Sequence, residues 1–74
     1  MPRPTPGIKN RAWHRKLRRH GCTLVRTSGG HAIYRAPTGR QFVTIGEGRA
    51  TDPTFKAIEP AAKALGLTIQ EVLS

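Results

Sequence analysis

The sequence predicts a small α+β domain in which a helix comes first, a three-stranded antiparallel sheet follows, and helical segments end the chain. Two observations support this fold class. A segment with apolar residues at helical spacing precedes three short segments rich in β-branched and aromatic residues, which turns containing glycine separate. A second segment with helical spacing follows the strands. The 74 residues suffice for one domain with one small core between the sheet and the helices.

The start of the chain differs in composition from the rest. Residues 1–9 contain three prolines, one glycine and two basic side chains, a composition that buries little apolar area. We therefore expect residues 1–9 to form a flexible basic arm and residues 10–74 to form the folded domain.

The first helix is expected over residues 11–20. Asn10 is the expected N-cap, and Gly21 is expected to end the helix. Trp13 and Leu17 lie one turn apart and indicate the buried face. The outer face is expected to carry Arg11, His14, Arg15, Arg18 and Arg19. Because solvated helices normally mix charges of both signs, this basic face indicates contact with phosphates.

Three strands are expected at residues 22–26, 31–36 and 40–45, where β-branched and apolar side chains are frequent. The segments between them, residues 27–30 and 37–39, consist of small residues and proline, which are typical of tight turns. Such short connections join antiparallel neighbours, so the three strands are expected to form a meander.

The second strand has apolar side chains on both of its faces. His31, Ile33 and Arg35 share one face, and Ala32 and Tyr34 share the other, because successive side chains of a strand point to opposite sides. If Ile33 faces the helices, His31 and Arg35 lie on the same side. The sequence leaves open which face is buried.

A second helix is expected to begin at Asp52 and Pro53, an N-cap followed by proline at the first helical position. Apolar residues at spacings of three and four indicate its buried face, namely Phe55, Ile58, Ala62 and Leu65. Pro60 predicts a kink or a break into two short helices.

A possible short third helix ends the chain. Gly66 is expected to stop the second helix, and Thr68 and Glu71 are spaced as a capping box. Val72 and Leu73 supply its apolar side.

Charge is distributed unevenly along the sequence. All four acidic residues lie at or after position 47, whereas ten of the thirteen Lys and Arg residues and all three histidines lie before it. The basic residues before position 47 repel one another and do not contribute to the hydrophobic core. They favour binding of a polyanion such as a nucleic acid, because its phosphates release counterions when the protein binds. The expected phosphate-binding residues are Arg15, Arg18, Arg19, Arg26, Arg35 and Arg40.

We expect a soluble, cytoplasmic protein without a metal site. No apolar run approaches the roughly 20 residues that cross a bilayer, and the start lacks the apolar segment of a signal peptide. Cys22 has no second cysteine with which to form a disulfide or a thiolate metal site, which fits a reducing compartment. His14 and His20 lie on different faces of the first helix, so a shared metal is not expected.

The order of the expected elements is similar to that of the double-stranded-RNA-binding fold. Residues 17–26, 29–35 and 39–45 resemble the HicA (YcfA-like) toxin family, and the resemblance covers roughly residues 12–74. Its most specific part is a strand, a turn of small residues that ends in Gly-x-His, and x-Ile-Tyr-Arg after it.

The resemblance implies a metal-independent endoribonuclease that degrades mRNA, requires no cofactor and is silenced by a HicB-type antitoxin. It implies that His31, which matches the family's strand histidine, is the catalytic residue. Three departures stand beside this match. The family usually has serine where this chain has Gly30, an aromatic where it has Cys22, and Pro-x-His where it has residues 46–48.

RNA cleavage without a metal requires a base for the 2′-hydroxyl, an acid for the 5′-oxygen, and cations around the phosphate. Histidine can fill the proton-transfer roles near neutral pH. Arg26, Arg35 and Arg40 lie on the expected sheet and are candidates for the cations. Tyr34 is a candidate for stacking on an unpaired base, with packing in the core as its alternative.

Three functions remain open at this point. The protein is a toxin-like endoribonuclease, a catalytically inactive nucleic-acid-binding protein on the same fold, or a small interaction protein of phage or mobile-element type that docks on an acidic partner. Membrane binding is not expected, because the basic helix offers too few apolar anchors. The oligomeric state and the choice between RNA and DNA are not determined by the sequence.

Overall fold

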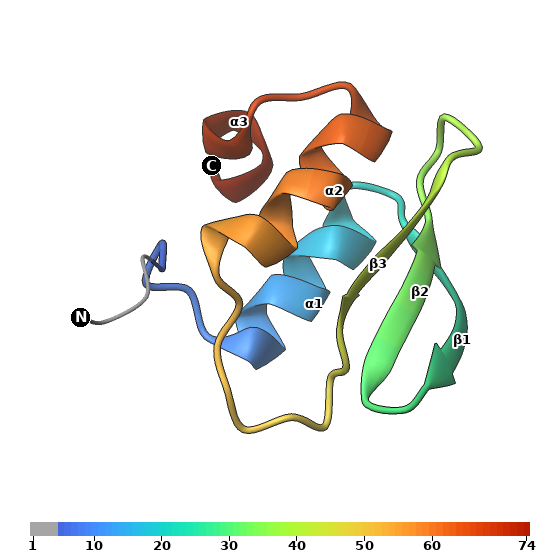
Figure 1. Ribbon diagram of the computed structural model, residues 1–74. Helices are drawn as coiled ribbons and strands as arrows, with labels where there is room; N and C mark the ends of the chain where they lie inside the picture. Colours follow the sequence, from blue (N-terminus) through green and yellow to red (C-terminus); the bar gives the residue numbers. More distant parts are fainter. Residues whose placement is uncertain (1–4) are drawn as a thin grey trace.

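The computed structural model describes residues 5–74. Its elements follow in the order α1 (Asn10–Arg19), β1 (Thr23–Ser28), β2 (His31–Arg35), β3 (Gln41–Ile45), α2 (Phe55–Leu65) and α3 (Ile69–Leu73). The strands form one antiparallel sheet in the order β1-β2-β3, and α1 and α2 lie on the same side of it (Figure 1). The predicted α+β fold, with helix, meander and helices, is therefore confirmed, including the short last helix.

The arm expected at residues 1–9 falls in part on residues 1–4, which lie outside the described residues. Ile8, just before α1, is partly buried and packs against the core. Among residues 5–74, no helix has both the length and the apolar character needed to cross a membrane.

The first turn of the sheet is tighter than predicted. Only Gly29 and Gly30 connect β1 to β2, with φ angles of +54° and +83°. Two successive residues with positive φ are typical of a type I′ hairpin, which favours glycine at both positions. The strand β1 therefore continues to Ser28, two residues beyond its predicted end, and pairs there with His31.

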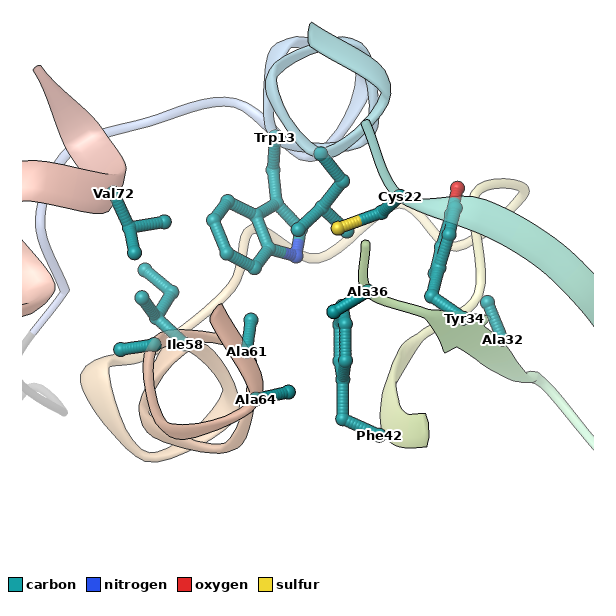
Figure 2. Packing of buried hydrophobic residues seen from close by; sticks show 12 residues of the cluster. Trp13, Cys22, Ala32, Tyr34, Ala36, Phe42, Ile58, Ala61, Ala64 and Val72 are labelled. Carbon is teal, nitrogen blue, oxygen red and sulfur yellow. The ribbon is translucent and has the colours of Figure 1, made fainter. Parts of the chain in front are cut away.

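One core lies between the sheet and the helices. The largest fully buried side chains include Trp13, Leu17, Tyr34 and Ile58. Figure 2 shows the Trp13 indole between the ribbons of α1 and α2. Its N–H donates a hydrogen bond to the Thr44 hydroxyl at 3.0 Å, which satisfies the one polar group of the buried ring. The predicted buried face of α1, defined by Trp13 and Leu17, is confirmed.

Burial settles which face of β2 meets the helices. Ala32 and Tyr34 are 1% and 0% exposed, whereas His31 and Arg35 are exposed. The face that carries His31, Ile33 and Arg35 is thus the outer face of the sheet. This outcome leaves the His31 imidazole accessible to a ligand.

The helix caps differ from the prediction. Asn10 is the first residue of α1, and its backbone N–H donates to the Asp52 carboxylate at 3.1 Å. A carboxylate at this position accepts from a backbone N–H that has no partner within the helix, and its negative charge interacts favourably with the positive end of the helix dipole. Asp52, expected to cap α2, therefore stabilises α1, and Thr54 caps α2 by accepting from the Ala57 N–H at 3.4 Å.

The second helix continues through its proline. α2 is one helix from Phe55 to Leu65 that contains Pro60, so the predicted break into two helices is not found. Ile58 and Ala61 on either side of the proline are fully buried, and this packing outweighs the loss of one backbone hydrogen bond. Phe55, predicted to be buried, is 37% exposed because it lies at the start of the helix.

Candidate active site

His31 lines a pocket of about 390 Å³ where the β1–β2 turn and β3 lie near the first turns of α2. Four parts of the chain form it, and their residues are Gly29, Gly30 and His31 of the β1–β2 turn, Val43, Thr44 and Ile45 of β3, Arg49 of the following loop, and Thr54, Lys56, Ala57 and Pro60 around the start of α2. The pocket thus brings an imidazole together with two cations, Arg49 and Lys56, that are far from it in the sequence.

The β1–β2 turn and the loop after β3 touch through two glycines. The Gly46 N–H donates to the Gly30 carbonyl at 2.8 Å. A Cβ on Gly46 would lie 2.7 Å from that carbonyl oxygen, closer than real Cβ atoms approach. Glycine at position 46 therefore permits the loop to lie directly against the turn that precedes His31.

Arg49 lies over this turn. A Cβ on Gly30 would be 2.9 Å from Nη1 of Arg49 and 3.6 Å from its Cζ. The guanidinium group therefore occupies space that a side chain at position 30 would take. Gly30 directly precedes His31, so the guanidinium group lies against the residue next to the imidazole in the sequence, and both side chains line the pocket.

The Asn10 side chain, at the start of α1, anchors the loop between β3 and α2. This side chain is 4% exposed, and its amide N–H groups donate to the carbonyls of Gly46 at 2.8 Å and Arg49 at 3.3 Å. The Arg49 N–H in turn donates to the Gly46 carbonyl at 3.1 Å. Because asparagine is common at helix starts, its sequence position indicated a cap and did not reveal this role.

The six arginines expected to bind phosphate lie outside this pocket. Their side chains are exposed on α1 (Arg15, Arg18, Arg19), on β1 and β2 (Arg26, Arg35) and before β3 (Arg40). Arg35 shares the outer face with His31, and Arg26 pairs with Ile33 on that face. Arg40 precedes Gln41, which pairs with Arg35 at the end of β2 opposite His31. The structure thus separates the α1 arginines from His31 and leaves Arg26 and Arg35 on its face.

Arg18 already has an acidic partner. Its guanidinium donates to both oxygens of the Glu47 carboxylate, at 3.2 and 3.3 Å. This contact lowers the pKa of Glu47 and raises that of Arg18. Both side chains are about half exposed, so the pair adds little stability, but it reduces the positive charge that Arg18 offers to a phosphate.

Tyr34 does not have a free ring for stacking on a base, so that prediction is wrong. The ring is fully buried and stacks on Phe42 with centroids 5.9 Å apart. The alternative role, packing in the core, is the one observed. Its hydroxyl lies 2.7 Å from Nδ1 of His14.

His14 was expected on the outer face of α1 and is instead fully buried. Its Nε2 lies 2.8 Å from the Ile45 carbonyl, which can only accept, so this nitrogen carries the proton. Nδ1 therefore accepts a hydrogen bond from the Tyr34 hydroxyl. Burial lowers the pKa of His14, an effect that the Ile45 carbonyl and Glu47 partly oppose, and burial also raises the pKa of Tyr34.

The buried neutral His14 predicts a stability that decreases in mild acid. Because its folded pKa lies below the ordinary 6.5, the unfolded chain binds the proton first as the pH falls. The free energy of unfolding should be unaffected by this group well above pH 6.5 and should fall below it, by at most about 1.4 kcal/mol per pH unit. Urea unfolding of wild type and His14→Gln between pH 8 and 5 measures this slope. A slope that survives in His14→Gln would contradict the assignment, and His31→Ala is the control that should keep it.

No group of three or more His, Cys, Asp or Glu side chains that could hold a metal ion occurs among residues 5–74. The lone thiol, Cys22, is buried, and burial raises its pKa. A buried thiol with a raised pKa is a poor nucleophile. His31, by contrast, is exposed and lines the same pocket as the cations Arg49 and Lys56.

Comparison with known families identifies the chain. Residues 13–67, well over half of the 74, match the family described as the HicA toxin of bacterial toxin–antitoxin systems. The matched segment contains the sheet, the loop and all of α2, and hence every residue that lines the pocket. Comparisons with curated proteins and with solved structures find no match. On the family match and on the helix, meander and helix that carry it, this chain belongs to the HicA toxins of bacterial toxin–antitoxin systems.

Proposed function

We propose that the protein is a metal-independent endoribonuclease that cleaves mRNA, with His31 as its general acid and base. The observation that carries this proposal is the position of His31, which is exposed at a tight turn and shares its pocket with Arg49 and Lys56. An accessible imidazole among cations fits a reaction that moves protons at a negatively charged phosphate. Membership of the family adds the toxin role and an antitoxin partner.

The reaction follows from the chemistry of RNA. The His31 imidazole takes the proton of a 2′-hydroxyl, and the 2′-oxygen attacks the adjacent phosphorus. The bond between phosphorus and the 5′-oxygen then breaks, the leaving oxygen takes a proton from water or from the imidazolium, and a 2′,3′-cyclic phosphate remains. Tyr34 cannot serve as the acid because its buried hydroxyl donates to His14. With one imidazole for two proton transfers, turnover should be slow.

The charge of the surface supports RNA as the polyanionic ligand. The chain carries a formal net charge of +9, and exposed arginines lie on α1 and on the strands β1 and β2. Affinity for RNA should therefore weaken steeply as salt rises. A HicB-type antitoxin is the partner that would silence the toxin, and the cytoplasm, where mRNA is translated, is the compartment in which both would act.

A cleavage assay tests the proposal. Purified protein, in excess over a single-stranded transcript, should cut it at low ionic strength with EDTA present, and the fragments should end in 2′,3′-cyclic phosphate. Transcripts that stay intact under these conditions would overturn the proposed activity. A DNA strand of the same sequence is the matched control, because it lacks the 2′-hydroxyl that the reaction requires.

A catalytically inactive nucleic-acid-binding protein is the second candidate. The exposed Arg15 and Arg19 on α1 favour it, because they lie outside the His31 pocket and need no chemistry to bind phosphates. Under this function RNA binds with strong salt dependence but remains whole in the same assay. Cleavage of the transcript in this assay therefore distinguishes the two candidate functions.

A further inference from the structure

The loop between β3 and α2 brings a positive charge to His31 that the sequence pattern did not indicate. Arg49 reaches the β1–β2 turn with Nη1 only 2.9 Å from where a Gly30 Cβ would lie. A Cβ at position 30 would force the guanidinium group, the far end of a flexible side chain, to move away from the turn. Gly30 also has a φ of +83°, which side chains rarely adopt.

The backbone of Arg49 is fixed on both sides. Its N–H donates to the Gly46 carbonyl, and its own carbonyl accepts from the buried Asn10 amide. Gly46 is itself bonded to Gly30. These bonds fix the backbone of Arg49 close to the site, so binding of an anion orders the side chain without also having to order the loop.

The charge of Arg49 is not neutralised. The carboxylates of the same loop are engaged elsewhere, Glu47 with Arg18 and Asp52 with Lys9. Among the ion pairs of residues 5–74, none includes Arg49 or Lys56. Both cations line the pocket, and so does the first turn of α2.

We propose that Arg49 binds the non-bridging oxygens of the scissile phosphodiester at His31, and that Gly30 provides the space for it. This inference rests on the proposed function and names the residue that holds its substrate. The planar guanidinium donates two parallel hydrogen bonds to a phosphate and stabilises the extra negative charge of the phosphorane. Gly30, which stands where the family usually has serine, thus leaves room for the Arg49 guanidinium in place of the serine hydroxyl.

Removal of the charge tests the binding role. Arg49→Gln should lower kcat/KM for transcript cleavage by about 100-fold, the usual effect of removing one donor to a transition-state anion. Measured in the His31→Ala background, where the RNA stays intact, its plot of log affinity against log salt should be less steep by about one unit. Lys63→Gln is the matched control, since it removes one exposed positive charge from α2 outside the pocket. It should leave kcat/KM unchanged.

The role of Gly30 requires a second comparison, because an alanine there also strains the backbone. Gly30→Ala should lower cleavage strongly in the wild-type background and clearly less in the Arg49→Ala background, where no guanidinium is displaced. The strain is the same in both backgrounds, so the difference measures the contact alone. Thermal unfolding of all variants checks that each remains folded.

The outcomes separate this inference from the proposed function. If His31→Ala is inactive and Arg49→Gln retains the activity and the salt slope of Lys63→Gln, the Arg49 role is wrong and the endoribonuclease stands. If wild type binds RNA without cleaving it, the function is wrong, and the salt slope alone decides whether Arg49 binds a phosphate. Wild type that neither cleaves nor binds RNA overturns both.

Discussion

His31→Ala should abolish toxicity and reduce RNA cleavage by between about 100-fold and 10,000-fold, the range that general acid–base catalysis supplies. RNA binding should remain, because the cations and the α1 arginines are unchanged. The fold should also remain, because the side chain is exposed and β2 pairs with its neighbours through the backbone. The large loss of rate with intact binding distinguishes a catalytic residue from one that only contacts RNA.

Two measurements check this result. Induced expression of wild type beside His31→Ala should arrest growth and deplete mRNA only with wild type, and purified proteins should show the same difference in single-turnover cleavage. Thr27→Ala is a suitable control, because Thr27 is exposed on the same hairpin but pairs with Ala32 on the opposite face. Cleavage by His31→Ala at the wild-type rate would show that another group moves the protons. Equal losses of binding and cleavage would make His31 a contact residue.

The order of the elements was predictable because each depends on neighbouring residues. The amphipathic spacing of Trp13 and Leu17 marks α1, and the Gly29–Gly30 turn joins two β-rich segments. The orientation of β2 was not predictable, because Ile33 on one face competes with Tyr34 on the other, and a shift of one residue exchanges the faces. Packing of α1 and α2 on the sheet decides that choice.

The His14 position did carry a signal that sequence reasoning missed. His14 follows Trp13 and precedes Leu17 by three residues, a spacing that places all three on one side of a helix. The surrounding basic residues suggested a solvated side chain. Burial is possible because two partners, the Tyr34 hydroxyl and the Ile45 carbonyl, satisfy both ring nitrogens.

The site could be predicted only in part. His31 followed from the resemblance to the family, but Arg49 and Lys56 join it through tertiary contacts between a turn, a loop and a helix. Gly30 and Gly46 were the available signal, since glycine adopts the positive φ of a tight turn and permits a close approach of two backbones. Nothing in the sequence paired these two glycines.

Asn10→Ala should be the most destabilising change near the site that spares the apolar core. The buried Asn10 amide donates to the loop carbonyls of Gly46 at 2.8 Å, Arg49 at 3.3 Å and Glu47 at 3.5 Å, and its loss leaves them without these donors. Unsatisfied buried groups cost about 1–3 kcal/mol each, although removal of Oδ1, which has no partner among the described residues, offsets part of this. We expect a net loss of about 2 kcal/mol, which lowers the unfolding midpoint of a domain this size by about 8–16 °C. Cleavage should also fall, because the loop that carries Arg49 loses its anchor.

Asn10→Asp separates the contribution of the amide donors from the contribution of side-chain size. Aspartate has nearly the same size but only acceptor oxygens, so it would place a charge against the Gly46 and Arg49 carbonyls and should destabilise at least as much as alanine. Gln70→Ala, which removes an exposed amide from α3, should change the free energy of unfolding by less than about 0.5 kcal/mol. Differential scanning calorimetry of the three variants measures these differences. An Asn10→Asp protein as stable as wild type would mean that the amide donors do not hold the loop, and Arg49 would then have to reach His31 by other contacts.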